Sequence, residues 1–207
     1  MYKRQLYNTA VGEGALYTNV DGSNSVAVGR LALYTQDPAT ATDMYNTAVG
    51  YGAGQAITTG YDHTLVGSLA GDAITTAYEN VALGKNALGA DTLGSRSTAL
   101  GRGALLVQNF TTATETWNVA VGNYTGGALT VGLKNVLVGS LAGDALTDAD
   151  FNVAMGHGAL STDTLGSKSV ALGYAALSTQ NFTTATDSYN TAVGYTAGTA
   201  VTTGINN

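Results

Sequence analysis

The chain has 207 residues, with 28 glycines, one proline and no cysteine, and only 11% of its residues are charged. Fourteen acidic residues against eight basic ones give a net charge of −6. We expect no nucleic-acid partner, because the chain lacks the positive field that attracts phosphates. The absence of cysteine excludes disulfides and thiolate metal sites, and no run of about 18 apolar residues predicts insertion into a membrane.

The first seven residues match no later part of the sequence. Residues 1–5 read Met-Tyr-Lys-Arg-Gln, which resembles the translation of an adapter used for sequencing libraries. We therefore leave them out of the fold prediction and expect a metagenomic reading frame. No secretory signal is predicted, because no apolar run precedes a small-residue cleavage site. We expect residues 8–207 to form one array that is a piece of a longer fibre.

Residues 8–207 follow a two-level repeat. Eleven glycines each follow a tetrad such as Asn46-Thr47-Ala48-Val49, and their spacing defines 17-residue coils, of which every fourth is lengthened to a 21-residue coil. Four coils form a 72-residue cycle, and more than half of residues 46–117 are identical to their counterparts in 118–189. Such a fixed period predicts a solenoid. The eleven coils begin at Asn8, Ser25, Asn46, His63, Asn80, Ser97, Asn118, Asn135, Asn152, Ser169 and Asn190.

Each tetrad predicts a very short strand, since its second position is always Thr or Val and its fourth is Val, Leu or Met. Positions two and four share one face of the strand, and position three takes the other. Position three is Ala in nine coils. We expect one face to fill the interior, and the alanine face to pack against a second surface. A second strand is predicted in segments such as residues 55–58, with glycine at the corners.

Two short strands and two corners in each coil predict an all-β fold, a flattened parallel β-solenoid of eleven coils. At about 4.8 Å per coil the rod would be roughly 50 Å long, and one four-coil cycle would advance about 19 Å. An α-helical repeat is excluded, because the tetrads alternate with period two and good helix formers are rare in them.

Two runs of residues carry a family resemblance. Residues 24–29 (Asn-Ser-Val-Ala-Val-Gly) and 169–173 (Ser-Val-Ala-Leu-Gly) resemble the head repeats of YadA-like trimeric autotransporter adhesins. Residues 46–54, together with Ile57-Thr58-Thr59-Gly60, resemble more closely the repeats of marine phage tail fibres. The resemblance implies a left-handed β-roll, three chains packed side by side, and a rigid projection from a virion or cell surface. Phage fibre is favoured over adhesin, because a virion protein needs no secretion signal.

The pattern predicts no enzyme, since a catalytic site needs unlike residues at one place and this chain repeats the same ones. We expect no catalytic residues, no cofactor and no metal site. His63 is assigned to corner hydrogen bonding and His157 to the solvent-facing variable pair after the glycine. Four recurring acids are interpreted as exposed, solubilising charges: Asp72, Asp91, Asp144 and Asp163. The column of threonines that includes Thr58 and Thr75 is too mixed with other residues to predict an ice-binding face.

The 21-residue coils are the most individual feature, because insertions in solenoids usually form loops on one face. Their aromatic residues are the candidate surface-binding residues: Tyr45, Phe110, Trp117, Phe182 and Tyr189. Two interpretations stay open. The aromatics either pack the loops against the roll or a neighbouring chain, or they bind host glycans or proteins by stacking. The first makes the chain a structural fibre segment and the second a binding module. In either case we expect self-association, with open strand edges that favour end-to-end stacking.

Overall fold

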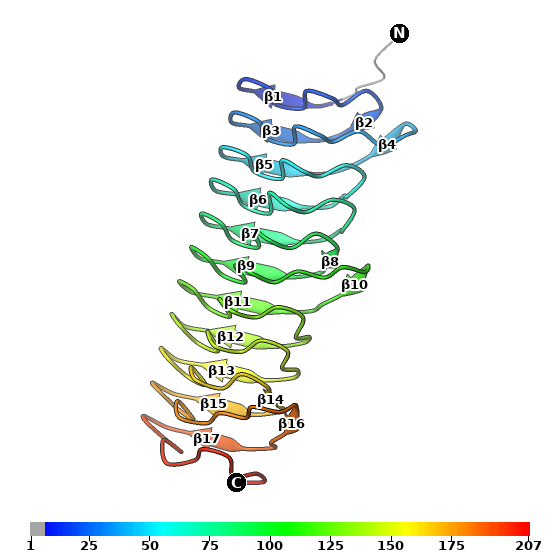
Figure 1. Cartoon of the computed structure of the whole chain (residues 1–207). Coiled ribbons are helices and arrows are strands. Elements are labelled where there is room, and N and C mark those ends of the chain that lie inside the picture. The colour runs from blue at the N-terminus through cyan, green and yellow to red at the C-terminus, as the bar shows by residue number, and fades with distance from the viewer. Residues whose placement is uncertain (1–6) are drawn as a thin grey trace.

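The computed structural model describes residues 7–207, and in this range all regular elements are strands. Residues 1–6, most of the predicted leader, lie outside the described residues. One strand from each coil joins an eleven-stranded sheet in which each coil lies on the next (Figure 1). These strands are β1 (Thr9–Val11), β3 (Val26–Val28), β5 (Thr47–Val49), β6 (Thr64–Val66), β7 (Val81–Leu83), β9 (Thr98–Leu100), β11 (Val119–Val121), β12 (Val136–Val138), β13 (Val153–Met155), β15 (Val170–Leu172) and β17 (Thr191–Val193). The predicted parallel β-solenoid is confirmed.

All pairings in this sheet are parallel and keep the repeat in register. Ala48 lies beside Leu65, for example, and Leu65 beside Ala82. Each position of one tetrad therefore meets the same position of the next. The lengthened coils keep this register too, because Ala99 pairs with Ala120 across a lengthened coil. The additional residues must therefore leave the stack before the next tetrad begins.

Each lengthened coil forms a small two-stranded parallel sheet with the coil before it. β2 (Gly22–Ser23) pairs with β4 (Thr42–Asp43), β8 (Gly94–Ser95) with β10 (Thr114–Glu115), and β14 (Gly166–Ser167) with β16 (Thr186–Asp187). The loops before β4, β10 and β16 project from the same side of the rod (Figure 1). They are the loops predicted from the 21-residue coils, and they recur once in every four coils.

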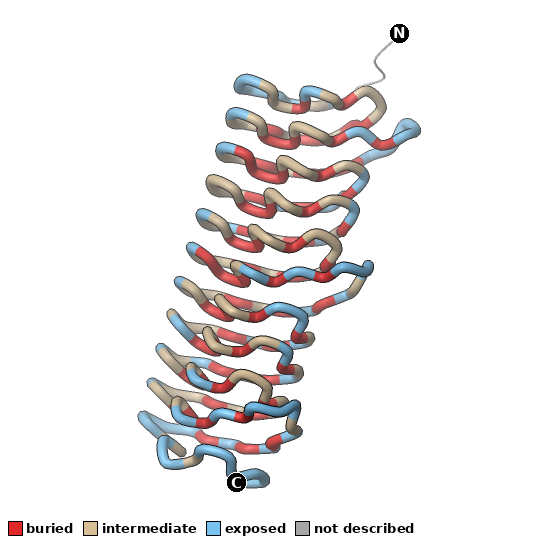
Figure 2. Tube along the Cα trace, viewed as in Figure 1, coloured by how far each residue is buried: buried red, intermediate tan, exposed pale blue. Residues whose placement is uncertain are grey.

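The alanine column points inward, so the predicted packing of this face against a second surface is wrong. The third-position residues from Ala27 to Ala171 are fully buried in the core, and Ala192 is 8% exposed. The segment that follows the tetrad glycine forms the opposite wall of each coil. Leucines from this wall, such as Leu88 and Leu105, belong to the same buried core as the third-position residues. In Figure 2 buried residues recur from coil to coil along the rod, whereas β1 at its N-terminal end is exposed. Side chains at positions two and four therefore face outward.

The two coils with leucine at position three show why alanine is preferred there. Leu65 stands where the opposite wall has Gly54 and Gly71 in place of leucine. A Cβ at Gly54 or at Gly71 would lie 2.9 Å from a methyl carbon of Leu65. Leu65 thus fills space that leucines of the opposite wall fill in other coils, which is how a dense interior avoids both cavities and overlap.

The opposite wall of each coil is built from turns, so the predicted second strand over residues such as 55–58 is absent from the described chain. Backbone geometry explains the difference. Two positions in this wall are left-handed in every coil, for example Leu31 at φ 61° and Leu33 at φ 47°. A left-handed residue interrupts the alternation that a strand requires. Bonds between coils still hold this wall, as from the amide of Leu33 to the carbonyl of Ala53 at 3.0 Å.

The glycine that closes each tetrad has φ between 125° and 140° in all eleven coils. At Gly101 an added Cβ would lie 2.2 Å from the carbonyl oxygen of Gly122 in the next coil. Both the backbone conformation and the space therefore require glycine. Gly194 has the same conformation, φ 134°, but the nearest atom to an added Cβ would be the Cβ of Ala197, 3.7 Å away, since no backbone of another coil lies against Gly194 in the described chain.

This difference makes Gly101→Ala and Gly194→Ala a matched pair. We expect Gly194→Ala to lower the free energy of unfolding by about 1–3 kcal/mol, the cost of a strained backbone. Gly101→Ala should lower it by several kcal/mol more, because two coils must also move apart. Urea unfolding followed by circular dichroism measures both. Equal losses would show that conformation alone, without the close approach of the backbones, explains the glycine column.

Candidate functional site

A ladder of buried side chains runs through the rod at the first position of the coils. The side-chain oxygen of Asn135 accepts a bond from the amide of Asn152 at 2.9 Å, and its side-chain nitrogen donates to the carbonyl of Ala149 at 2.7 Å. Asn118 and Asn152 make the same pair of bonds. Because an unpaired backbone group in the core is costly, each asparagine removes two such costs at once.

Serine replaces asparagine at the start of every 21-residue coil, and it is too short to make both bonds. A glutamine of the same coil makes the contact with the next asparagine that the serine cannot reach. The Nε2 of Gln108 donates to Ser97 Oγ at 2.9 Å, and its Oε1 accepts from Nδ2 of Asn118 at 2.9 Å. Gln36 and Gln180 connect their coils in the same way. The lengthened coils thus continue the ladder while they carry a projecting loop.

Asp91 and Asp163 are fully buried, so their interpretation as exposed charges is wrong. An oxygen of Asp91 accepts from the amides of Gly94 and Phe110, at 3.0 and 3.3 Å, and its carboxylate also accepts from Gln108. Burial raises the pKa of Asp91, and these bonds act against the rise. An Asp or Asn three residues before glycine, as in Asn19 and Gly22, is the turn signal that predicts this arrangement.

Asp72 and Asp144 are only partly exposed, and burial raises the pKa of both carboxyls. An oxygen of Asp144 is buried without a hydrogen-bond partner. Asp72 lines a hollow beside Gly89 together with Asn86 and apolar side chains. Neither acid is therefore the freely solvated charge that we predicted.

His63 occupies an asparagine position of the ladder, and its two ring nitrogens make the two contacts that an asparagine side chain makes in other coils. Its Nε2 is 2.9 Å from the carbonyl of Ala77, and its Nδ1 accepts from the amide of Asn80 at 3.2 Å. This network assigns the proton to Nε2. Burial lowers the pKa of His63 from 6.5 to about 4, and the bond to Ala77 opposes that shift. Protonation would place two donors, Nδ1 and the Asn80 amide, against each other.

The five candidate aromatic residues separate into two groups. Phe110 and Phe182 are each 6% exposed, and therefore lie against the rod. Tyr45, Trp117 and Tyr189 are 56%, 48% and 52% exposed. The second group shares one position, the left-handed last residue of its coil, with φ between 50° and 53°. We call the residues at this position the corner column: Tyr7, Asn24, Tyr45, Asp62, Glu79, Arg96, Trp117, Lys134, Phe151, Lys168, Tyr189 and Asn206.

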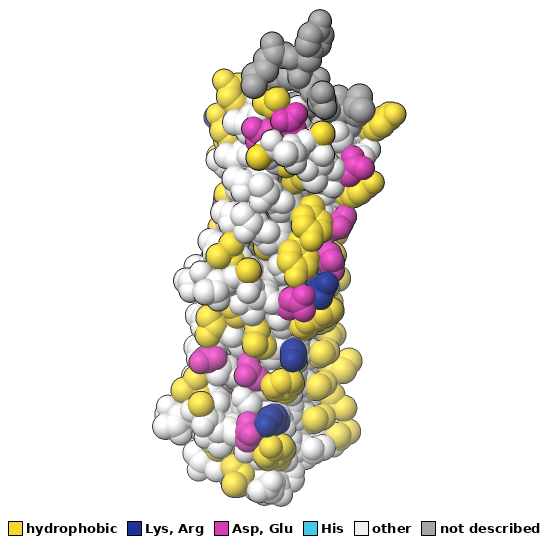
Figure 3. Space-filling view, turned by 90° about the vertical axis from the view of Figure 1, so that its right-hand side faces the viewer, with side chains coloured by type: hydrophobic (Ala, Val, Ile, Leu, Met, Phe, Trp, Pro, Cys, Tyr) yellow, Lys and Arg dark blue, Asp and Glu magenta, His cyan; other side chains and the backbone are white. Residues whose placement is uncertain are grey.

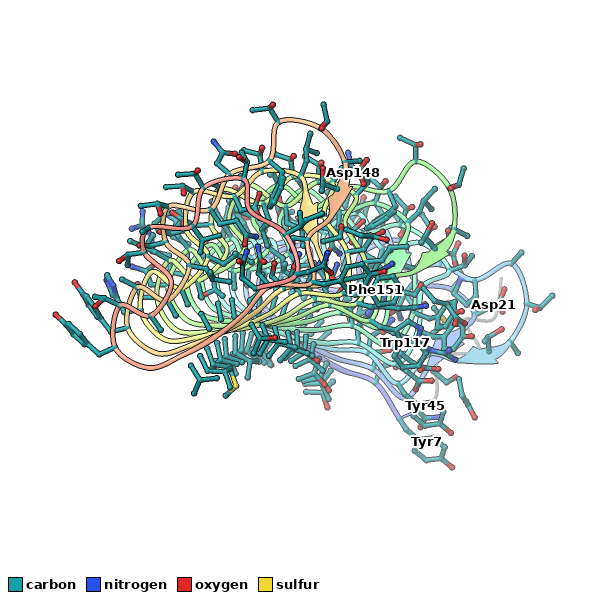
Figure 4. The ribbon with its side chains drawn as sticks, turned by 90° about the horizontal axis from the view of Figure 1, so that it is seen from below. Tyr7, Asp21, Tyr45, Trp117, Asp148 and Phe151 are labelled. Atoms are coloured by element: carbon teal, nitrogen blue, oxygen red, sulfur yellow. The ribbon has the colours of Figure 1, made fainter. Side chains whose placement is uncertain are left out.

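Cations and aromatic rings alternate along the C-terminal half of the corner column. Arg96 lies 4.7 Å from the ring centre of Trp117, and Lys134 lies 5.1 Å from that of Phe151. Arg96 also pairs with Glu79 at 2.9 Å and Glu115 at 2.8 Å. Figure 4 shows Tyr7, Tyr45, Trp117 and Phe151 on the same side of the rod. In Figure 3 hydrophobic side chains alternate with charged ones along the rod. Because Arg96 lies over the Trp117 ring, one face of that ring is occupied by a neighbouring cation.

The outward side of the eleven-stranded sheet is a second exposed surface, which we call the outer face. It consists of the side chains at positions two and four of every tetrad, which are the first and last residues of each strand, and only Thr, Val, Leu and Met occur there. Leu83 is 50% exposed, Met155 45% and Val193 68%. In Figure 4 these side chains form a flat comb along the underside of the sheet. The outer face therefore carries no charged side chain, and a mostly apolar surface of this kind is typical of an interaction site.

The role of His63 gives a prediction about pH. The folded chain keeps His63 neutral down to about pH 4, whereas the unfolded chain takes up its proton below pH 6.5. Neutral His63 therefore makes its whole contribution to the free energy of unfolding above pH 6.5. This free energy falls by about 3 kcal/mol as the pH drops to about 4. His63→Asn should abolish this part of the acid destabilisation and keep the ladder intact. His157→Asn, which changes the exposed histidine, should not, and equal acid profiles for both variants would contradict the assignment.

No family model, curated protein or solved structure that was compared with the chain matches it. Within residues 7–207 no helix is long and apolar enough to cross a bilayer, and no three His, Asp or Glu side chains gather as metal ligands. The function is therefore inferred from the corner column, the outer face and the continuity of the solenoid.

Proposed function

We propose that the chain is a structural segment of a rigid, elongated fibre, the shaft or head of a phage tail fibre or a similar appendage on a virion or cell surface. The observation that supports this most is the unbroken register of eleven parallel strands along one axis. A buried polar ladder and a glycine column couple every coil to the next over the same length. Bending the rod at any coil would break both sets of contacts together.

The outer face is the surface through which we propose that copies associate side by side, as a homotrimer. With eleven strands of three residues it measures about 50 by 10 Å, or roughly 500 Å². That is less than the roughly 800 Å² that each partner buries in a typical stable interface. The area grows with length, since each four-coil cycle adds about 19 Å of the same surface. Lateral association is therefore strongest in a long array, as a fibre requires.

Charge on the outer face should prevent this association. In the double variant Leu83→Lys/Met155→Lys, two ammonium groups would stand on the apolar comb, and burying them unpaired would cost several kcal/mol. We expect a monomer by sedimentation velocity where the unmodified chain forms a trimer. Thr112→Lys/Thr184→Lys adds the same charge at exposed loop positions and should leave the trimer intact. Because an interface of this size is expected to be weak, the comparison is made at high protein concentration, and an unmodified chain that stays monomeric there would contradict lateral association.

A second candidate function, a module that binds host glycans or proteins, is favoured by one observation. Tyr45, Trp117 and Tyr189 are about half exposed and occupy equivalent corners four coils apart, or about 19 Å. A linear ligand along the rod would meet one of these three rings in each cycle, and would also pass Phe151, which lies between Trp117 and Tyr189 in the corner column. Such a ligand must contact the free edge or face of each ring, because Arg96 already covers part of Trp117.

The second function predicts that Trp117→Ala/Tyr189→Ala abolishes adsorption to the host surface, since each stacked ring contributes about 0.5–1.5 kcal/mol and the loss is multiplied over many copies. Tyr51→Ala is the control, because Tyr51 is 45% exposed but lies outside the corner column. Cell-adsorption counts with fluorescently labelled protein measure the effect. Adsorption that survives the double variant would count against recognition by these rings.

A further inference from the structure

Three pairs of tyrosines from adjacent coils are stacked on the surface of the rod. The ring centres of Tyr17 and Tyr34 are 5.2 Å apart, with an angle of 1° between the ring planes. Tyr61 and Tyr78 are 5.4 Å apart at 8°, and Tyr174 and Tyr195 are 5.1 Å apart at 10°. The distances are close to the spacing of neighbouring strands, so the register of the solenoid itself holds each pair together.

The phenol rings of these pairs are open to solvent. Tyr17 is 65% exposed, Tyr61 40%, Tyr174 49% and Tyr195 76%, while Tyr34 and Tyr78 are partly exposed. An oxidant can therefore reach at least one ring of every pair. Because the ring planes are nearly parallel and the ring centres are 5.1 to 5.4 Å apart, the two phenols of each pair are held close to each other. Radicals generated on both rings would be held at this separation between ring centres, slightly more than one strand spacing.

We propose that these three pairs are sites of oxidative cross-linking to dityrosine by a haem peroxidase with hydrogen peroxide. Each phenol loses one electron and one proton, which gives two phenoxyl radicals. The radicals join through the ring carbons beside oxygen, and the two hydrogens on those carbons move to the oxygens to restore the phenols. The two electrons and two protons reduce one hydrogen peroxide to two waters. The protein loses two hydrogen atoms for each link.

The other exposed tyrosines differ from the three pairs in having no second tyrosine stacked on them within residues 7–207. Arginines lie over the rings of Tyr51 and Tyr124, at 5.8 and 5.1 Å. A cation over the ring does not separate the two groups, since Arg96 lies over Tyr78 at 5.4 Å. Tyr45 donates a hydrogen bond to Asp43 at 3.2 Å and stacks on no second tyrosine in the described chain. Proximity, and not exposure alone, therefore selects the three pairs, since two held groups react far faster than two free ones.

The links would join neighbouring coils covalently at three heights of the rod. Tyr17–Tyr34 and Tyr61–Tyr78 would each close a loop as long as one short coil, and Tyr174–Tyr195 would close one as long as a lengthened coil. A cross-link of this kind stabilises a chain by restricting its unfolded state, as a disulfide does. This chain has no cysteine, so dityrosine would supply the covalent staple that disulfides give many extracellular proteins.

The experiment oxidises dilute, folded protein with peroxidase and hydrogen peroxide. Dityrosine fluorescence gives the yield, and peptide mapping identifies the joined residues. We expect links at 17–34, 61–78 and 174–195, within single chains. The variant Tyr17→Phe/Tyr61→Phe/Tyr174→Phe keeps one ring over another but removes one phenol from each pair, and its yield should fall about tenfold or more. The matched variant Tyr45→Phe/Tyr51→Phe/Tyr124→Phe removes as many phenols and should keep the yield.

Three results would overturn the proposal. One is a folded chain that forms no dityrosine under these conditions. Another is a map in which Tyr51 or Tyr124 is joined as often as the stacked residues. The third is the same set of links after oxidation in denaturant, because the stacking exists only in the folded solenoid. A higher melting temperature of the oxidised protein, lost in the first triple variant, would support the stabilising role.

Discussion

The close approach of neighbouring backbones at the glycine of each tetrad is the constraint on which the rest of the solenoid depends. The amide of Gly101 donates to the carbonyl of Leu83 at 2.7 Å, and the carbonyl of Gly122 lies where a Cβ would stand. A side chain at this position would separate two coils and weaken every bond between them. Because the strands have only three residues each, the sheet has few other bonds with which to compensate.

The buried ladder shows how one polar requirement can be met by different residues. Asn135 uses an amide, His63 uses two ring nitrogens, and Ser97 uses the reach of Gln108. What the fold selects at this position is an acceptor towards the next coil and a donor towards a corner carbonyl. This third solution occurs in the three long coils, where the glutamine that replaces the missing amide stands in the same coil as the projecting loop.

The period, the parallel strand and the in-register stacking could be predicted from the residues, because each rests on spacing alone. The direction of the strand faces could not. Alternation shows that Val119 and Val121 share a face, but Ala120 is equally apolar, and only the leucines of the opposite wall decide which face is interior. The burial of Asp91 and the absence of a second strand depend on backbone hydrogen bonds and left-handed residues. Of the aromatics, Phe110 and Trp117 differ in burial although both belong to one coil.

The same register decides the chemistry of the surface. Each exposed side chain has as its neighbours the residues one coil earlier and one coil later, so a surface column behaves as one interacting series. Glu13, Arg30 and Tyr51 form such a series, with a 3.0 Å ion pair and a cation over a ring. Exposed ion pairs of this kind contribute little to stability. Functional residues of a solenoid are therefore recognised as pairs between coils, and a partner meets them at the period of the coil rather than as isolated side chains.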